Sequence, residues 1–169
     1  MTTLRRFFIW LPLVAFFFYQ FLLRVSPGVM GDDITQFFKV TATEFGLLTS
    51  LYYAGYAFMQ IPIGLLLDKY GPRYLAAGSI FICAIGAILF ATTDSWFVAL
   101  VSRLMIGMGS SGAFISASKA LRLWFPENKF SLYMSLTVTI GLLGAFSGGK
   151  PIASLVESCG WQTSLLILG

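Results

Sequence analysis

Two arginines stand inside long apolar runs, and they are the residues of this chain best suited to bind a charged solute. Arg24 lies 17 residues into the run 7–30, and Arg103 lies seven residues into the run 96–117. If these runs cross a bilayer, each charge should face protein or water. A planar guanidinium suits carboxylate or phosphate oxygens, so two at a similar depth on one cavity would clamp an anion. The alternatives are that Arg24 extends to the membrane interface and that Arg103 is hydrogen-bonded to helix carbonyls.

Polar side chains at helical spacing surround this possible clamp. Gln20 precedes Arg24 by four residues, so both fall on one helix face. Further along, Tyr52, Tyr56 and Gln60 follow the spacing i, i+4, i+8. Such a stripe is typical of a solute cavity, and equally of buried aromatic packing with a hydrogen-bonded tip. The candidate substrate-binding residues are therefore Arg24, Arg103, Gln20, Tyr52, Tyr56 and Gln60.

Groups for covalent or metal chemistry are sparse. The chain has no His, and no Asp or Glu lies well within an apolar run. Cys83 and Cys159 lack the spacing of metal ligands, and no Gly-x-Ser-x-Gly turn occurs. We therefore expect no catalytic residue, no metal and no cofactor, which argues against a membrane-embedded transferase.

The elements that must position these residues are membrane-spanning helices. Hydrophobic residues make up 57% of the chain and charged residues only 11%, whereas about 25% of a soluble domain is charged. Apolar runs recur along the whole chain without the alternation of strands. The sequence predicts an all-α polytopic membrane helix bundle with spans at 7–30, 44–67, 74–92, 96–117 and 130–153, and a partial span at 161–169. Nine helical residues cover only about 14 Å, so the sixth span is expected to be truncated.

A short charged turn separates the second and third spans. It runs from Gly64 to Arg73 and contains Asp68, Lys69 and the pair Gly71-Pro72. Glycine followed by proline cannot continue a helix, so the chain should reverse there. The charged side chains place this reversal at a membrane surface.

The other connections are expected to be loops or surface segments. Residues 31–43 form a polar loop that ends in a helix start at Thr41 to Glu44, with a hydroxyl cap and an acid in the first turn. Residues 119–129 have an amphipathic order, which predicts a short segment lying along the membrane until Pro126 breaks it.

Basic residues gather on one side of the predicted bundle. Seven lie in the loops on the side of the N-terminus, and only Lys39 lies in the opposite loops. The positive-inside rule then predicts a multi-pass protein of the plasma (inner) membrane with a cytoplasmic N-terminus. The net charge of +4 does not indicate nucleic-acid binding, because the basic residues form no patch on a soluble face. The seven are Arg5, Arg6, Lys69, Arg73, Lys119, Arg122 and Lys129.

Three motifs resemble those of the major facilitator superfamily of transporters. The turn Gly64-x-x-x-Asp68-Lys69-x-Gly71-x-Arg73 resembles its signature between membrane helices two and three, with Pro72 at a position that is usually basic. Arg103-x-x-x-Gly107-x-Gly109 resembles a fourth-helix motif associated with the transport path. The stretch 144–149 resembles the fifth-helix motif of drug/proton antiporters, except that alanine replaces its proline at position 145.

The resemblance implies the N-terminal six-helix half of a twelve-helix carrier, and it covers the whole chain. Its partners would be a small-molecule substrate, the lipid bilayer and a C-terminal six-helix half. It also implies that the signature turn is a conformational latch between the halves, carried by Gly64, Asp68, Lys69, Gly71 and Arg73. Small residues at helical spacing should allow close helix packing at Gly107, Gly109, Gly141, Gly144 and Gly148.

The functional expectation is secondary transport of a small organic or phosphorylated anion by alternating access. With no acid inside the spans, a symporter or antiporter would need its coupling group in the other half; otherwise transport is exchange or facilitated. The alternatives are a fragment with no transport of its own and an efflux carrier of the drug/proton-antiporter type.

Overall fold

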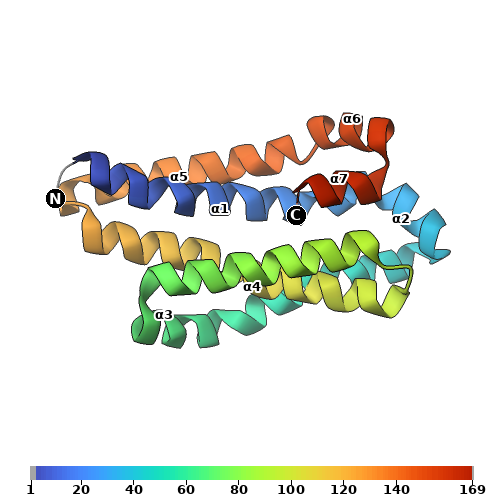
Figure 1. The fold of residues 1–169 in the computed structure, drawn as a ribbon, viewed down its shortest axis with the longest axis horizontal. Coiled ribbons are helices and arrows are strands. Elements are labelled where there is room, and N and C mark those ends of the chain that lie inside the picture. Colours follow the sequence, from blue (N-terminus) through green and yellow to red (C-terminus); the bar gives the residue numbers. More distant parts are fainter. Residues whose placement is uncertain (1–2, 169) are drawn as a thin grey trace.

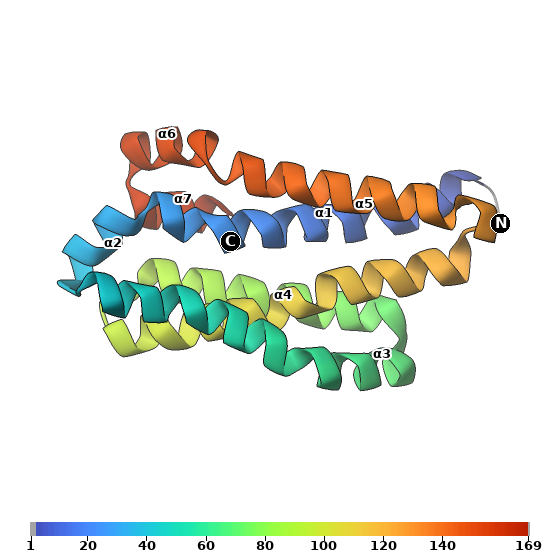
Figure 2. The same ribbon diagram turned by 180° about the vertical axis from the view of Figure 1, so that it is seen from behind.

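Helices form an elongated bundle in which most axes run along its length (Figures 1 and 2). The computed structural model describes residues 3–168, and no strand occurs among them. Four helical stretches are long and apolar enough to cross a membrane, which confirms the predicted all-α membrane bundle. The helices are α1 (Thr3–Val29), α2 (Gly31–Phe38), α3 (Ala42–Thr92), α4 (Trp96–Trp124), α5 (Glu127–Ser147), α6 (Lys150–Cys159) and α7 (Trp161–Leu168).

The long helix α3 consists of two antiparallel arms. The chain reverses at Gly71, whose φ of 78° and ψ of 169° are not helical. This positive φ strains any side chain, and the following Pro72 cannot donate an amide hydrogen bond. The reversal therefore lies where the sequence predicts it, and α3 contains both of the segments expected to be the second and third spans, which form the hairpin seen in Figure 1.

The first arm of α3 begins at the capping motif that the sequence predicts. The backbone N–H of Glu44 donates to Thr41 Oγ1 at 3.3 Å, and the backbone N–H of Thr41 donates to Glu44 Oε2 at 2.7 Å. This reciprocal capping box satisfies two amide groups that would otherwise lack partners. It fixes where the first arm starts.

The expected loop over 31–43 is largely a helix, so that prediction is wrong. Residues Gly31–Phe38 form α2, and Lys39 ends it in the left-handed conformation with φ 54°. Ile34 is completely buried, and the Phe38 ring lies 5.4 Å from the Trp96 ring. The apolar side of this short helix packs on the bundle, because its hydrophobic residues recur three and four positions apart.

The expected surface segment over 119–129 is also wrong as a separate element. The helix α4 continues without a break to Trp124, and Pro126 precedes the first residue of α5. Ala120 and Leu121 are buried, and they pack in clusters that include residues of α1. This apolar burial holds the last two turns of α4 against α1.

The expected fifth span, 130–153, is divided. The helix α5 ends at Ser147, and α6 begins at Lys150 after Gly149, whose ψ of −115° is not helical. Pro151 explains the division, because its ring would clash with the carbonyl of Ser147 in a continuous helix. Figure 2 shows the offset between α5 and α6.

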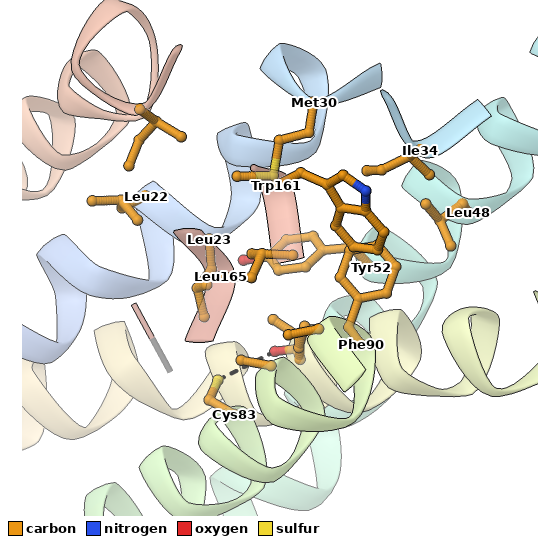
Figure 3. Close-up of a cluster of buried hydrophobic side chains, with 14 of the residues drawn as sticks. Leu22, Leu23, Met30, Ile34, Leu48, Tyr52, Cys83, Phe90, Trp161 and Leu165 are labelled. Atoms are coloured by element: carbon orange, nitrogen blue, oxygen red, sulfur yellow. Dashed lines mark hydrogen bonds between the residues drawn. The ribbon is translucent and has the colours of Figure 1, made fainter. Parts of the chain in front are cut away.

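The largest cluster of buried hydrophobic side chains reaches the end of the bundle opposite the N-terminus, called here the distal end. There α1, α2, α3 and α7 meet, and Figure 3 shows the side chains that they contribute. The Trp161 ring of α7 lies 5.8 Å from the Phe90 ring of α3. Elsewhere α4 packs along both arms of α3, and α1 packs along α5. The cluster includes Met30, Ile34, Leu48, Tyr52, Cys83, Phe90, Trp161 and Leu165.

Candidate functional site

Arg24 lies on α1 with its guanidinium held by aromatic groups and partly open to the surface. Its Nε donates to the Tyr53 hydroxyl at 3.3 Å. The guanidinium carbon lies 4.7 Å from the centre of the Tyr53 ring and 5.6 Å from that of Phe21. Such cation–π contacts orient the charge without neutralising it. The guanidinium therefore keeps its charge and is partly exposed.

Arg103 lies on α4 and is enclosed, with only 1% of its surface exposed. Its Nη1 donates to the backbone carbonyl of Leu23 at 3.2 Å, across to α1. The rings of Tyr52 and Phe90 lie 5.3 and 5.9 Å from its guanidinium carbon. Its Nε is buried without a hydrogen-bond partner. The hydrogen bond from Nη1 joins α4 to α1. It has the geometry of the alternative given above, in which Arg103 is hydrogen-bonded to a helix carbonyl.

The two arginines flank one pair of rings, but only Arg24 is partly exposed, whereas Arg103 is enclosed. Arg24 lies over Tyr53 and Arg103 over Tyr52, and these two rings are 5.4 Å apart in an edge-on arrangement. The one ion pair among residues 3–168 lies elsewhere, so neither arginine has a carboxylate partner there. A clamp that needs both cations on one open surface is not formed here.

The other candidate binding residues divide between the core and the surface. The Tyr52 hydroxyl donates to Gln20 Oε1 at 2.9 Å, and both side chains are buried. The Tyr56 ring stacks on the Tyr52 ring with centroids 6.4 Å apart, and Tyr56 and Gln60 are half-buried. Gln20 and Tyr52 therefore take part in core packing, whereas Tyr56 and Gln60 lie nearer the surface.

Tyr53 is the residue that the sequence interpretation missed. It is 49% exposed and is the direct hydrogen-bond partner of Arg24. A signal was present, because Tyr53, Tyr56 and Gln60 also follow a helical spacing, i, i+3, i+7. Choosing between this face and the face of Tyr52 requires the rotation of the first arm of α3 against α1. The periodicity of a single helix does not determine how that helix is rotated against its neighbour.

The signature turn holds an ion pair within this bundle. Lys119 Nζ of α4 donates to Asp68 Oδ1 of α3 at 3.0 Å, and the side chains are 38% and 73% exposed. Sequence reasoning placed Lys119 in a connecting segment, so this partner of Asp68 was missed. The continuous helix α4 is what brings Lys119 to the turn.

The remaining residues of the turn have separate surroundings. Lys69 Nζ lies 5.3 Å from the centre of the Tyr70 ring. Arg73 lines a groove against the N-terminal end of α1. A Cβ added to Gly64 would meet no atom of a neighbouring helix within 4 Å.

Comparison with known proteins matches the family model described as Major Facilitator Superfamily to residues 12–169. The match covers almost the whole chain. The chain belongs to the Major Facilitator Superfamily. It is accordingly a multi-pass membrane protein of a transporter family, in agreement with its apolar helices.

Relatives of this superfamily member are named as transporters. It is 34% identical over 146 residues to the "Uncharacterized transporter YybO" of Bacillus subtilis, covering 86% of this chain and 34% of that protein. It is 27% identical to the "Probable sulfoacetate transporter SauU" of Cupriavidus necator, covering 90% and 36%. It is 22% identical to the hexuronate transporter of Bacillus subtilis, covering 94% and 38%. The chain thus spans about a third of the length of these relatives.

Glycines set the closest helix contacts of this superfamily member. A Cβ on Gly107 would overlap the Tyr52 backbone, and one on Gly109 would overlap the Ser79 carbonyl and Cys83. In the pair α1 and α5, Gly141 lies against Phe17 and Gly144 against the Phe18 backbone. Gly148 has more room, since its Cβ would lie 3.2 Å from Val25 Cβ. Close approach of this kind stabilises helix pairs in lipid.

The described residues contain no set of side chains placed to bind a metal ion. Within residues 3–168, no group of three or more His, Cys, Asp or Glu side chains lies close enough to hold an ion. Cys83 is buried, and its Sγ donates to the Ile106 carbonyl at 3.4 Å.

Proposed function

We propose that this chain is the N-terminal helical half of a secondary transporter for a small organic or phosphorylated anion. The observation that carries the proposal is Arg24, a partly exposed cation within a predicted span that has no carboxylate partner among the described residues. An unpaired charge at membrane depth is costly unless a counter-ion or water meets it. An anionic substrate supplies that counter-ion.

The surroundings of Arg24 suit selective anion binding. The guanidinium presents several N–H donors in a plane, and carboxylate, sulfonate and phosphate groups can accept two of them together. The Tyr53 hydroxyl adds a polar group beside the charge, and Phe21 supplies an apolar wall. Relatives named for sulfoacetate and hexuronate transport support this substrate class.

Arg103 is proposed to position the site rather than to contact the anion. By donating to the Leu23 carbonyl, it fixes the register of α4 on α1 one residue before Arg24. Its ring partner Tyr52 adjoins Tyr53, which holds Arg24. A change at Arg103 would therefore reach the site through the backbone of α1 and through the tyrosine pair.

Alternating access is proposed to use the signature turn as a latch. With the N-terminus in the cytoplasm, Asp68 lies at the cytoplasmic surface of the plasma (inner) membrane, paired with Lys119. A latch requires a contact whose energy differs between two states. Asp68 would exchange Lys119 for a group on the C-terminal six-helix half, while Gly71 keeps the reversal tight.

The proposal is tested by uptake into proteoliposomes containing a full-length protein that carries this chain. Sulfoacetate and hexuronate, labelled with ¹⁴C, are the first anions to measure. The matched variants are Arg24→Gln, and Lys129→Gln, an exposed basic residue outside the site. We expect Arg24→Gln to raise the KM at least tenfold and Lys129→Gln to leave it unchanged. An Arg24→Gln protein with unaltered KM, or no uptake of any organic anion, would overturn the proposal.

A further inference from the structure

A narrow groove of about 210 Å³ lies between the two arms of α3, beside the signature turn. It follows the hairpin that Figure 1 shows, and Met108 of α4 also lines it. Its walls are mainly apolar and include the buried side chains of Ile63 and Leu75. Gly78 leaves the groove open, because a Cβ added there would meet no atom within 4 Å.

Each arm of α3 supplies one wall, made by residues that recur at helical spacing. The stripe on the first arm is Met59, Ile63, Leu66 and Tyr70, and the stripe on the second arm is Tyr74, Gly78 and Ile82. Met59 precedes Tyr70 by eleven residues, so the groove extends about 16 Å along the arms. This length is half of a hydrocarbon core of about 30 Å. The groove therefore covers the depth of one membrane leaflet, starting from the turn.

The size of the groove selects a thin occupant. A helix is about 10 Å wide with its side chains, so a piece as long as the groove would fill more than about 1,000 Å³. The groove offers only about 210 Å³. A single extended hydrocarbon chain is narrow enough to lie between the two stripes. In a bilayer, the acyl chains of lipids are the hydrocarbon chains that surround an apolar helix surface.

The end of the groove at the turn, called here its mouth, is positively charged. Lys69 is exposed, and its Nζ lies 5.3 Å from the centre of the Tyr70 ring, which lines the groove. Arg73 is a second exposed cation of the same turn. The one ion pair among residues 3–168 is formed by other side chains, so both cations lack a carboxylate partner there. Tyr70 and Tyr74 are also exposed, as is typical of tyrosines at a membrane–water interface.

We propose that this groove binds one acyl chain of an anionic phospholipid, in the leaflet that contains the signature turn, and that Lys69 binds the phosphate of that lipid. Anionic lipids gather where Lys and Arg cluster beside membrane helices. The groove then orders one chain of the lipid, which contacts both arms of the hairpin. The occupant is distinct from the transported anion, because Tyr53 and Phe21, which contact Arg24, do not line the groove.

The proposal is tested by native mass spectrometry of the full-length protein that carries this chain, in detergent. The dissociation constant of the first bound lipid is measured for phosphatidylglycerol and for phosphatidylcholine with the same acyl chains. Lys69→Gln removes the charge at the mouth, and Lys129→Gln is its control at another exposed position. Gly78→Leu fills the groove. Gly46→Leu is its control, because a Cβ at this exposed glycine also meets no atom within 4 Å, and the residue lies outside the groove.

We expect phosphatidylglycerol to bind several times more tightly than phosphatidylcholine. Lys69→Gln should weaken phosphatidylglycerol about fivefold and phosphatidylcholine hardly at all, because it removes one cation that faces the anionic lipid. Gly78→Leu should weaken both lipids severalfold, because its side chain takes the place of the acyl chain. Lys129→Gln and Gly46→Leu should leave both dissociation constants unchanged.

Three results would overturn the proposal. Equal affinities for the two lipids in the unmodified protein would show that lipid contacts this surface without selection. Unchanged phosphatidylglycerol binding in Gly78→Leu would show that the turn binds a headgroup without the groove, or that another segment covers the groove. Unchanged binding in Lys69→Gln would remove the phosphate contact. Because Lys69 is exposed, Lys69→Gln keeps the test decisive if Gly78→Leu does not fold.

Discussion

Arg24 and Arg103 lie at similar predicted depths, and the structure gives them opposite surroundings. Arg103 is enclosed by α1, α3 and α4 and donates to a backbone carbonyl. Arg24 is partly exposed, and its contacts within residues 3–168 include the hydroxyl and ring of Tyr53 and the ring of Phe21. One cation therefore joins two helices, and the other is partly exposed and is the one proposed above to bind the anion.

The difference teaches that a charge within a span has two distinct uses. Burial against a carbonyl turns an arginine into a bridge between helices, with its stem filling space. Partial exposure beside aromatic rings orients a charge without neutralising it, and this is the charge that we propose binds an anion. The adjacent tyrosine differs in the two cases. Arg103 lies over Tyr52, which is enclosed, and Arg24 lies over Tyr53, which is exposed.

The largest expected contrast comes from removing each arginine. Arg103→Ala leaves a cavity in the enclosed region and removes the hydrogen bond between α4 and the Leu23 carbonyl, which keeps only the Ser26 hydroxyl as donor, so we expect a loss of about 2–4 kcal/mol in unfolding free energy. Arg24→Ala should cost less than about 1 kcal/mol, because its side chain is only partly buried. Reversible unfolding in mixed detergent micelles measures both. Equal losses would show that the two regions are not distinct.

The tightness of the enclosed region is tested one turn along α4. In Gly107→Ala the new methyl group falls on the Tyr52 backbone, so the helices must separate, at a cost of about 1–3 kcal/mol. Gly46→Ala is the matched control, because its methyl group meets nothing within 4 Å and alanine favours the helix. The same unfolding measurement applies. A Gly107→Ala protein as stable as Gly46→Ala would contradict the close contact.

Adjacent tyrosines allow the finest division of the two regions. Tyr52→Phe removes a buried hydroxyl and leaves Gln20 without its donor, which should cost about 1 kcal/mol. Tyr53→Phe removes an exposed hydroxyl while keeping the ring under Arg24, so its cost should be below about 0.5 kcal/mol. Anion binding, measured by calorimetry on the full-length protein, should be weakened more by Tyr53→Phe. If Tyr53→Phe cost more stability and Tyr52→Phe weakened anion binding more, Tyr53 would belong to the enclosed region and Tyr52 to the open one.

A small effect on stability is also expected at the signature turn, outside both regions. Asp68→Asn removes an exposed ion pair with Lys119, which should cost less than about 1 kcal/mol and less still at high salt. A double-mutant cycle with Lys119→Gln measures the coupling directly. A coupling well above 1 kcal/mol that resists salt would mean that the pair is a structural brace and not a weak, exchangeable contact.

The sequence contained most of the architecture, because long apolar runs, Gly71-Pro72 and the Thr41–Glu44 cap are local signals. It failed where tertiary packing overrode a polar or amphipathic appearance. The buried side chain of Ile34 packs α2, which was expected to be a loop, onto the bundle. The buried side chains of Ala120 and Leu121 hold the end of α4 on α1. The division of α5 from α6 was visible in Pro151 and was overlooked.

The candidate site was harder to predict, because it depends on how helices are rotated against each other. Both arginines were found from their position in apolar runs, yet the enclosure of Arg103 follows from its reach to Leu23 on another helix. The choice of Tyr53 over Tyr52 has the same origin. Periodicity within one helix gives faces, and only the packed bundle shows which face meets which neighbour.

The most direct test of the account is chemical modification of arginine by phenylglyoxal, followed by mass spectrometry of the peptides that contain Arg24 and Arg103. The account predicts that Arg24 in the reconstituted chain reacts, that an organic anion in the full-length protein slows this reaction, and that Arg103 stays unmodified in the folded state. Modification of Arg103 as fast as Arg24, or no protection of Arg24 by any transported anion, would contradict the separation of an anion-facing arginine from a helix-bridging one.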